Sequence, residues 1–246
     1  MAAQDRAKPT DWRSLLIVLV LTAIEYAVLR LLDSALPRLA ASLPAPPGAP
    51  ALWWSALQNL VPLGCADLIA ALVPLSLYLA WRRRSLRELG FGRPGTALAW
   101  ILALSVQAAI VWLQARNPYG PLAHARNLLN PYALGGAAFA GLAAGFAEET
   151  FFRGYIMDEL SRGGFAVPWQ VIISMLLFGA IHLSFASLDW TVPVLTGLLG
   201  GFWSIIYVLG RRSLWPSIAA HFINDAVIVP SFFYMMAAHG VRYGVR

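Results

Sequence analysis

Seven apolar segments, each long enough to cross a lipid bilayer, constrain this chain most strongly. A membrane-spanning helix needs about 20 apolar residues. The segments are residues 14–32, 53–81, 96–115, 128–152, 166–183, 190–210 and 213–236. Because backbone polar groups in lipid must hydrogen-bond within their own segment, helices are expected rather than open strands. The sequence therefore predicts an all-α fold, a polytopic transmembrane helical bundle of about seven helices.

The composition excludes an ordinary soluble domain. Apolar residues make up 59% and charged residues 12% of the chain, against about 45–50% and about 25% in soluble domains. The net charge of +6 comes from arginines dispersed among loops, which favours contact with membrane lipids over nucleic acid. The single cysteine, Cys65, excludes an intrachain disulfide and a multi-cysteine metal site.

Proline and charge place the loops. The stretch LPAPPGAP at 43–50 cannot continue a helix and predicts a loop between the first two helices. We expect an N-terminal part, 1–127, of helices and linker, and a catalytic helical part, 128–246. A break at Pro62 would add an eighth helix. It is disfavoured because it would move either the arginines of 82–93 or the basic N-terminus to the opposite side of the membrane.

The distribution of basic residues predicts the orientation. With seven passes, 12 of the 18 lysines and arginines fall on the side of the N-terminus. Cytoplasmic loops carry the excess of positive charge. We therefore expect a cytoplasmic N-terminus and an external C-terminus. Glu25 and the length of the first apolar run favour an uncleaved first helix over a signal peptide. The expected location is a bacterial inner membrane.

A few charged groups lie in or next to the apolar helices, where they are costly and indicate function by default. Residues four apart share a helix face, and this spacing joins Glu149 to Arg153 and His221 to Asp225. Glu148 points about 100° away from Glu149, toward an expected cavity. With His182 they form one candidate site supplied by three helices. Other polar residues within the apolar segments, Glu25, Asp67 and Gln107, are interpreted as packing or polar contacts between helices.

These groups suffice to hydrolyse an amide without a serine or cysteine nucleophile. A carboxylate beside an imidazole can activate water, and a second imidazole with a polar partner can stabilise the oxyanion. The glycine and alanine density of 133–147 permits the close helix packing that could shape a wet cavity. Two alternatives remain open: a proton-coupled transporter, although no inverted repeat is visible, and a catalytically silent immunity or scaffold protein.

Three motifs resemble those of one family of intramembrane proteases. Residues 148–154, EETFFRG, resemble its EExxxR motif, and residues 178–182, FGAIH, resemble its FxxxH motif. His221 followed by Asp225 resembles its HxxxN/D motif. Their order and spacing over about 130–236 identify a member of the CAAX protease and bacteriocin-processing (CPBP) family, which includes type II CAAX prenyl proteases and proteins like lysostaphin resistance protein A.

The resemblance implies an intramembrane endopeptidase acting on a peptide or protein substrate. It also implies roles for the matched residues, and the sequence departs from many members at one of them. Where they have asparagine, this chain has Asp225, whose ionised carboxylate accepts hydrogen bonds but cannot donate. Asp225 must therefore be protonated, orient His221 or help to bind a metal, unless Asn224 is the donor. The implied roles are water activation for Glu148 and His182, pairing for Glu149 and Arg153, and oxyanion stabilisation for His221 and Asp225.

Metal dependence stays open at this stage, as does the depth of the site. Zinc is a candidate cofactor, with Glu148, His182, His221 and Asp225 as candidate ligands, and a purely glutamate-dependent mechanism is the alternative. Simple alternation of the helices also separates the histidines in depth. It places His182 near the outer end of its helix and His221 about 10 Å from the inner end. Tilt of the helices, or a helix over 128–160 that is longer than assigned, would reconcile them.

Overall fold

The computed structural model describes residues 10–117, 130–185 and 190–240, and within these ranges it contains helices and no strands. The all-α prediction is confirmed. The elements are α1 (Trp12–Ala41), α2 (Ala51–Trp81), η1 (Leu86–Leu89), α3 (Ala97–Arg116), α4 (Pro131–Glu148), η3 (Glu149–Ile156), α5 (Met157–Arg162), α6 (Val167–Ile181), η4 (His182–Phe185), α7 (Thr191–Leu209) and α8 (Trp215–Ala238).

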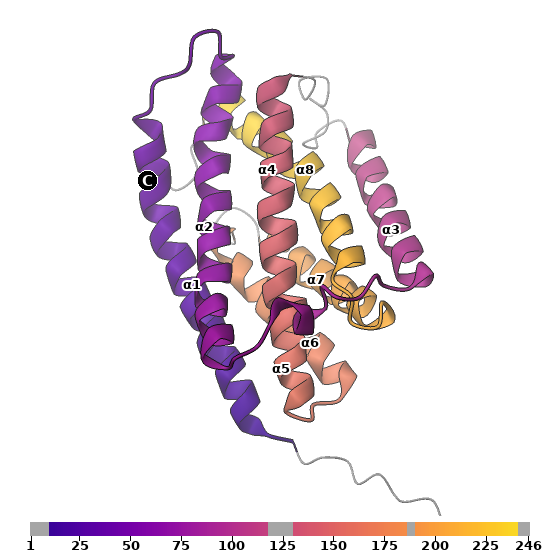
Figure 1. Ribbon diagram of the computed structural model, residues 1–246. Helices are drawn as coiled ribbons and strands as arrows, with labels where there is room; N and C mark the ends of the chain where they lie inside the picture. Colours follow the sequence, from indigo (N-terminus) through magenta and orange to yellow (C-terminus); the bar gives the residue numbers. More distant parts are fainter. Residues whose placement is uncertain (1–9, 118–129, 186–189, 241–246) are drawn as a thin grey trace, which may run out of the picture.

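The helices form a bundle that has the features of a membrane protein. Five of them, α1, α2, α3, α7 and α8, are long and apolar enough to cross a bilayer, and α6 is a shorter apolar helix. Beside these six helices, α4, η3 and α5 follow one another without a break and form a seventh continuous helical rod (Figure 1). Each of the seven predicted segments thus corresponds to one helical rod. Helix α1 begins at the lower end in Figure 1 and α8 ends near the upper one.

The predicted end of the first helix is wrong, whereas the second helix is unbroken as predicted. Helix α1 extends beyond residue 32 to Ala41, because Asp33 is buried rather than solvated. Helix α2 runs through Pro62 without a break, which confirms the prediction of one helix here over the disfavoured split into two. Prolines are tolerated in such helices where neighbouring helices pack around them. The predicted loop over 43–50 is confirmed, because no helix covers these residues.

The rod formed by α4, η3 and α5 passes the predicted end at residue 152 and continues to Arg162. At Glu149 the α-helix widens into the π-helix η3. Such π-helical turns are rare and occur frequently at functional sites. Arg153, expected just beyond the apolar segment, lies inside this rod and is fully buried. The longer helix therefore carries both candidate carboxylates and Arg153 into the bundle.

Helices α4 and α8 are held close together by glycines, as the small residues of 133–147 predicted. A Cβ atom added to Gly145 would lie 2.8 Å from the backbone nitrogen of Phe222, and one added to Gly141 would lie 2.7 Å from the Phe222 carbonyl oxygen. Backbone atoms cannot move aside as a flexible side chain can. The close approach brings His221 of α8 level with the end of α4.

We expect Gly145→Ala to lower the thermal stability of the protein in detergent, because the new methyl group overpacks against α8 at a cost of about 1–3 kcal/mol. Gly135→Ala is the matched control on the same helix, since its added Cβ meets no atom within 4 Å. Thermal unfolding of the two variants should differ clearly. Equal melting temperatures would mean that the helices are less tightly packed than described.

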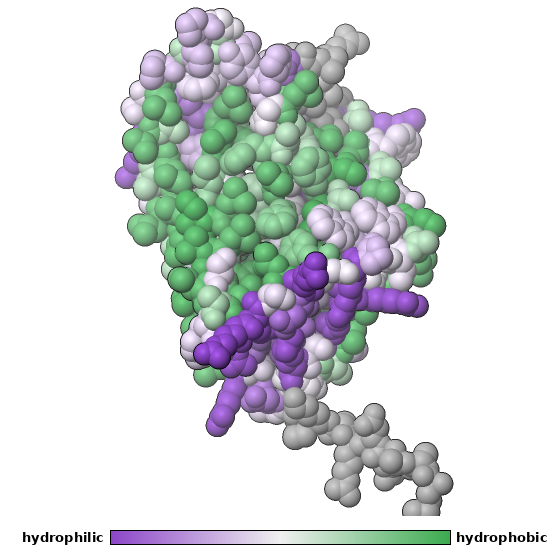
Figure 2. All heavy atoms as spheres, in the orientation of Figure 1, coloured by the Kyte–Doolittle hydropathy of each residue, from purple (hydrophilic) through white to green (hydrophobic). Residues whose placement is uncertain are grey.

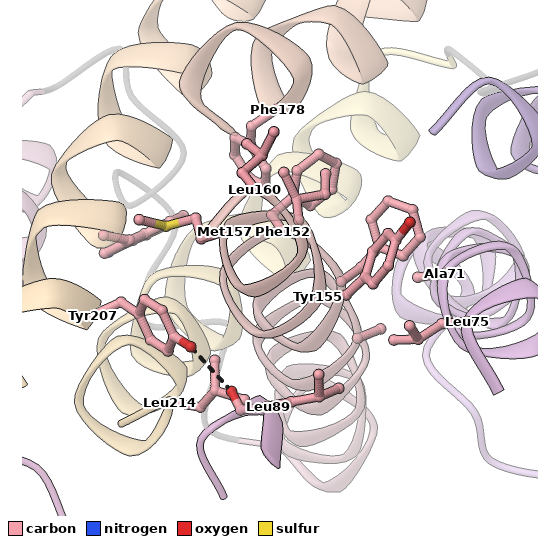
Figure 3. Close-up of a cluster of buried hydrophobic side chains, with 14 of the residues drawn as sticks. Ala71, Leu75, Leu89, Phe152, Tyr155, Met157, Leu160, Phe178, Tyr207 and Leu214 are labelled. Carbon is pink, nitrogen blue, oxygen red and sulfur yellow. Dashed lines mark hydrogen bonds between the residues drawn. The ribbon is translucent and has the colours of Figure 1, made fainter. Parts of the chain in front are cut away.

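A cluster of buried aromatic and aliphatic side chains packs around η3. Phe152 and Tyr155 project from η3 into buried residues of neighbouring helices (Figure 3). The Tyr207 hydroxyl of α7 donates to the Leu89 carbonyl oxygen at 3.3 Å, the contact drawn as a dashed line in Figure 3. This contact fastens η1 and α7 together and fixes the positions of the segments around η3.

Polar residues gather at the end of the bundle where α1 begins and α2 ends, beneath an apolar band (Figure 2). Arg84 pairs there with Asp158 and Glu159 of α5, and Arg162 pairs with Glu88 at 3.0 Å. The pKa of Glu88 lies below its usual value, mainly because the backbone N–H of Ser85 donates to its carboxylate. These pairs join η1 to α5. Exposed arginines lie at the start of α1, between α2 and α3, at the end of α5 and after α7. They are Arg13, Arg82, Arg83, Arg87, Arg93, Arg162 and Arg211.

Candidate active site

The centre of the site is a buried chain of three side chains. Glu149 Oε1 accepts a hydrogen bond from Arg153 Nη1 at 2.9 Å and lies 2.9 Å from His221 Nδ1. Arg153 Nη2 donates to the Gly200 carbonyl oxygen of α7 at 2.7 Å. Glu149 and Arg153 are 0% exposed, so their contact is an internal ion pair and not a surface one. The chain ties η3, α7 and α8 together.

His221 is fixed on its ring face as well as at its edge. The indole of Trp203 stacks on the imidazole, with ring centroids 3.9 Å apart and an interplanar angle of 23°. Because Glu149 holds Nδ1, the other nitrogen faces the remaining acids. His221 Nε2 lies 3.6 Å from both Glu148 Oε2 and Asp225 Oδ2. The structure thus brings together the carboxylates and the imidazole that the motifs predicted.

His182 reaches the same place from α6. Its Nδ1 lies 2.8 Å from the Phe178 carbonyl oxygen, and since a carbonyl only accepts, Nδ1 carries the proton. The Phe178 ring packs against both imidazoles, with centroid distances of 4.9 Å to His182 and 6.0 Å to His221. The predicted separation in depth is therefore wrong. Helix α6 ends at Ile181, so His182 lies at the site, where the chain enters η4.

A cavity of about 480 Å³ opens beside these groups. Glu148, His182 and Asp225 line it, and most of the remaining wall is apolar. Glu148 Oε2 is buried and has no hydrogen-bond partner among the described residues. The expected cavity is thus present, and the unbonded oxygen of Glu148 leaves an acceptor for a small polar molecule.

Asp225 and Asn224 are linked to α3. Asn224 Nδ2 donates to Asp225 Oδ1 at 2.7 Å, and Gln107 Nε2 donates to Asn224 Oδ1 at 3.2 Å. Gln107 is 1% exposed, and its bond to Asn224 supports the interpretation of Gln107 as a contact between helices. Because the Asn224 amide is engaged by Asp225 and Gln107, the geometry favours an orienting role for Asn224 over that of a direct donor to the oxyanion.

The candidate zinc ligands do not form a metal cage. Across the described ranges, no group of three or more His, Cys, Asp and Glu side chains lies close enough together to hold a metal ion. The arrangement therefore does not fit the four-residue zinc set, and the chemistry below is derived from the protein groups alone.

Several residues of the site were missed from the sequence. Trp203 and Gly200 sit in an uncharged segment, where aromatic and small residues are ordinary packing, so no signal singled them out. A Cβ on Gly200 would lie 2.9 Å from Arg153 Nη2, which explains the need for glycine. Asp67, interpreted as a packing residue, lines the cavity together with Asp33. For Asp33 and Asp67, a charged residue within or next to an apolar segment was the signal that could have pointed to the cavity.

The fold and the site define a helical membrane protein with a buried glutamate–arginine–histidine centre. Residues 130–227 match the family described as type II CAAX prenyl endopeptidase Rce1-like. All three motifs lie within the matched range, so the match confirms the resemblance of this part of the chain to the CAAX protease family. Helices α1 to α3 lie outside the matched range. Neither the curated proteins nor the solved structures that were searched gave a match.

Proposed function

We propose that this protein is an intramembrane endopeptidase in which Glu148 activates a water molecule for attack on a peptide carbonyl. The observation that carries the proposal is the buried chain from Arg153 through Glu149 to His221. It holds His221 Nε2 3.6 Å from Glu148 Oε2, beside a cavity that a peptide and a water could enter. The family match supports a protease of this type in general.

Glu148 is the proposed general base. Its Oε2 has no hydrogen-bond partner among the described residues, so it can accept a proton from water. His182 carries its proton on Nδ1, and in the neutral ring Nε2 is an acceptor that can orient the same water. Water adds to the carbonyl carbon, its proton passes to Glu148, and Glu148 returns the proton to the departing nitrogen as the C–N bond breaks.

His221 is the proposed donor to the oxyanion. Glu149 accepts from Nδ1, and in the imidazolium form Nε2 also carries a proton that it can donate to the tetrahedral oxygen. Asp225 lies 3.6 Å from Nε2 and is itself held by Asn224. Many members of the family have asparagine at this position. We assign Asp225 to charge balance and to the orientation of His221, since an ionised carboxylate donates no hydrogen bond.

The test is cleavage of a peptide library by the purified protein in nanodiscs, with the cleavage sites read by mass spectrometry. Products that appear with wild type and are absent with Glu148→Gln support the proposal. No cleavage by wild type, together with a proton flux that Glu148→Gln abolishes, would support the transporter alternative instead.

We further propose that the end of the bundle with the exposed arginines faces the cytoplasm of a bacterial cell. Basic residues concentrate on the cytoplasmic side, and the arginine-rich segments between α2 and α3 and between α7 and α8 share this end with the start of α1. A reporter fused after α8 should be active only outside the cytoplasm, and one inserted in 82–95 only inside it. The reverse pattern would overturn this orientation.

A further inference from the structure

Helix α3 carries one buried polar side chain toward α8. The helix stands at the edge of the bundle (Figure 1), and its buried residues are Ala99, Ala103 and Gln107. Because they are spaced four apart, these three residues lie on one face of the helix. The alanines need no hydrogen-bond partner, whereas Gln107 is 1% exposed and its carboxamide is costly to bury without one. Gln107 therefore requires a polar partner on the neighbouring helix.

The hydrogen bond that Gln107 makes leads to the active site. Gln107 Nε2 donates to Asn224 Oδ1 at 3.2 Å, and Asn224 Nδ2 donates to Asp225 Oδ1 at 2.7 Å. The second carboxylate oxygen, Asp225 Oδ2, lies 3.6 Å from His221 Nε2. We call the side chains of Gln107, Asn224 and Asp225 the amide relay. It connects α3 with the imidazole that is the proposed donor to the oxyanion.

The order of donors and acceptors in the amide relay is set at its Gln107 end. A carboxamide has an acceptor oxygen on one side and a donor nitrogen on the other, so Asn224 could face Asp225 with either. The N–H of Gln107 holds the Asn224 oxygen toward α3 and turns the Asn224 nitrogen toward Asp225. This nitrogen occupies Oδ1 of Asp225 and leaves Oδ2 facing His221. Removing the Gln107 donor would free Asn224 to turn an acceptor toward the carboxylate.

Gln107 lies outside the parts of the protein that contact a substrate. Among the described residues, Asn224 and Asp225 line the cavity beside Glu148, and Gln107 does not. Gln107 also precedes the range 130–227 that matches the CAAX protease family. Members of one hydrogen-bond network depend on one another energetically. A change at Gln107 is therefore expected to reach the imidazole through the network, without altering the surface that binds a peptide.

We propose that Gln107 is a positioning residue for the hydrolytic reaction, which sets the direction of the amide relay and thereby the orientation of Asp225 against His221. This inference rests on the proposed function. Gln107 acts through Asn224 and Asp225 and touches no reacting atom. Helix α3 thus supplies more than a packing contact, because it completes from outside the matched range the support of an imidazole on α8.

Gln107→Met tests the amide relay, because methionine is similar in length, suits an apolar helix and donates no hydrogen bond. For one peptide in nanodiscs, kcat per folded protein should fall about 3- to 30-fold, a size typical of coupling within a hydrogen-bond network. KM should stay within about twofold, because binding surfaces are unchanged. An unchanged kcat in folded Gln107→Met protein, or a rise in KM alone, would overturn the proposal.

Gln114→Met is the matched control. Gln114 belongs to the same helix, seven residues further along, where it is half-buried and outside the amide relay. The replacement of a carboxamide by a thioether is the same, so kcat should stay close to that of wild type. A loss equal to that of Gln107→Met would show that α3 acts through its packing and contradict a role of the relay.

Asn224→Ala removes the middle of the amide relay. Its loss of kcat should be at least as large as that of Gln107→Met. The variant with both changes should be little slower than Asn224→Ala alone, because Gln107 acts through Asn224. Losses that multiply in the double variant would mean that Gln107 acts by another route, and the proposed direction of the relay would be wrong.

Nuclear magnetic resonance of ¹⁵N-histidine-labelled protein in detergent separates failure of the amide relay from failure of the proposed function. The His221 signals are those lost in His221→Gln. Gln107→Met and Asn224→Ala should shift the His221 Nε2 resonance, and Gln114→Met should not, even if no peptide is cleaved. An unshifted resonance in both relay variants, with cleavage by wild type, would overturn the relay alone. Shifted resonances without any cleavage by wild type would overturn the proposed function and keep the relay.

Discussion

Glu148→Gln is expected to lower kcat for peptide hydrolysis by about 10²–10⁴-fold, the range typical of a lost general base, while the protein folds normally. Glutamine keeps the size of the side chain but cannot take the proton from water. Little stability should be lost, because Glu148 Oε2 makes no hydrogen bond to the described protein groups. The assay is cleavage by purified protein in nanodiscs, normalised to folded protein.

Glu149→Gln is the informative comparison, since it makes the same replacement of a carboxylate by a carboxamide at the neighbouring residue. Glu149 Oε1 contacts both Arg153 Nη1 and His221 Nδ1, so its loss should reduce melting temperature and activity together. If Glu148→Gln were instead the destabilised variant and Glu149→Gln were merely slow, the roles of the two glutamates would have to be exchanged.

Arg153→Ala is expected to destabilise the protein by about 3–5 kcal/mol, the usual cost of leaving one member of a buried ion pair without its partner. The guanidinium is 0% exposed and holds both Glu149 and the Gly200 carbonyl. The change should lower the yield of folded protein and the melting temperature in detergent. Adding Glu149→Gln should restore part of the loss, since the unpaired buried charge is then removed.

Arg162→Ala is the matched control, because it also removes an arginine from ion pairs but at a side chain that is 49% exposed. Exposed pairs contribute about 1 kcal/mol or less. A stable Arg153→Ala protein that retains Glu149 would mean that the pair is hydrated and that the buried centre is misplaced.

The number of helical rods could be predicted because their determinants are local. An apolar run of about 20 residues has one stable form in lipid, and all seven runs correspond to helices. The ends of the helices were less well predicted wherever a charged residue was taken as a stop. Asp33 and Arg153 are both buried within helical rods, because contacts with other elements, which a single segment does not reveal, accommodate their charges.

The site was predictable as a set of residues but not as an arrangement. Spacing correctly paired Glu149 with Arg153, whereas the bond between Glu149 and His221 joins residues 72 positions apart and depends on the close packing of α4 against α8. The stack of Trp203 on His221 is of the same kind. In an apolar chain a tryptophan carries no signal that separates packing from orientation of a catalytic ring.

The most direct test of the water mechanism is a double-mutant comparison of Glu148→Gln, His182→Ala and the variant that carries both changes. The measured quantity is kcat for one peptide, normalised to folded protein. Because the two side chains are assigned to the same water, each single change should remove most of the activity, and the double variant should be little slower than either. Retained turnover in Glu148→Gln, or single defects that multiply in the double variant, would contradict the mechanism.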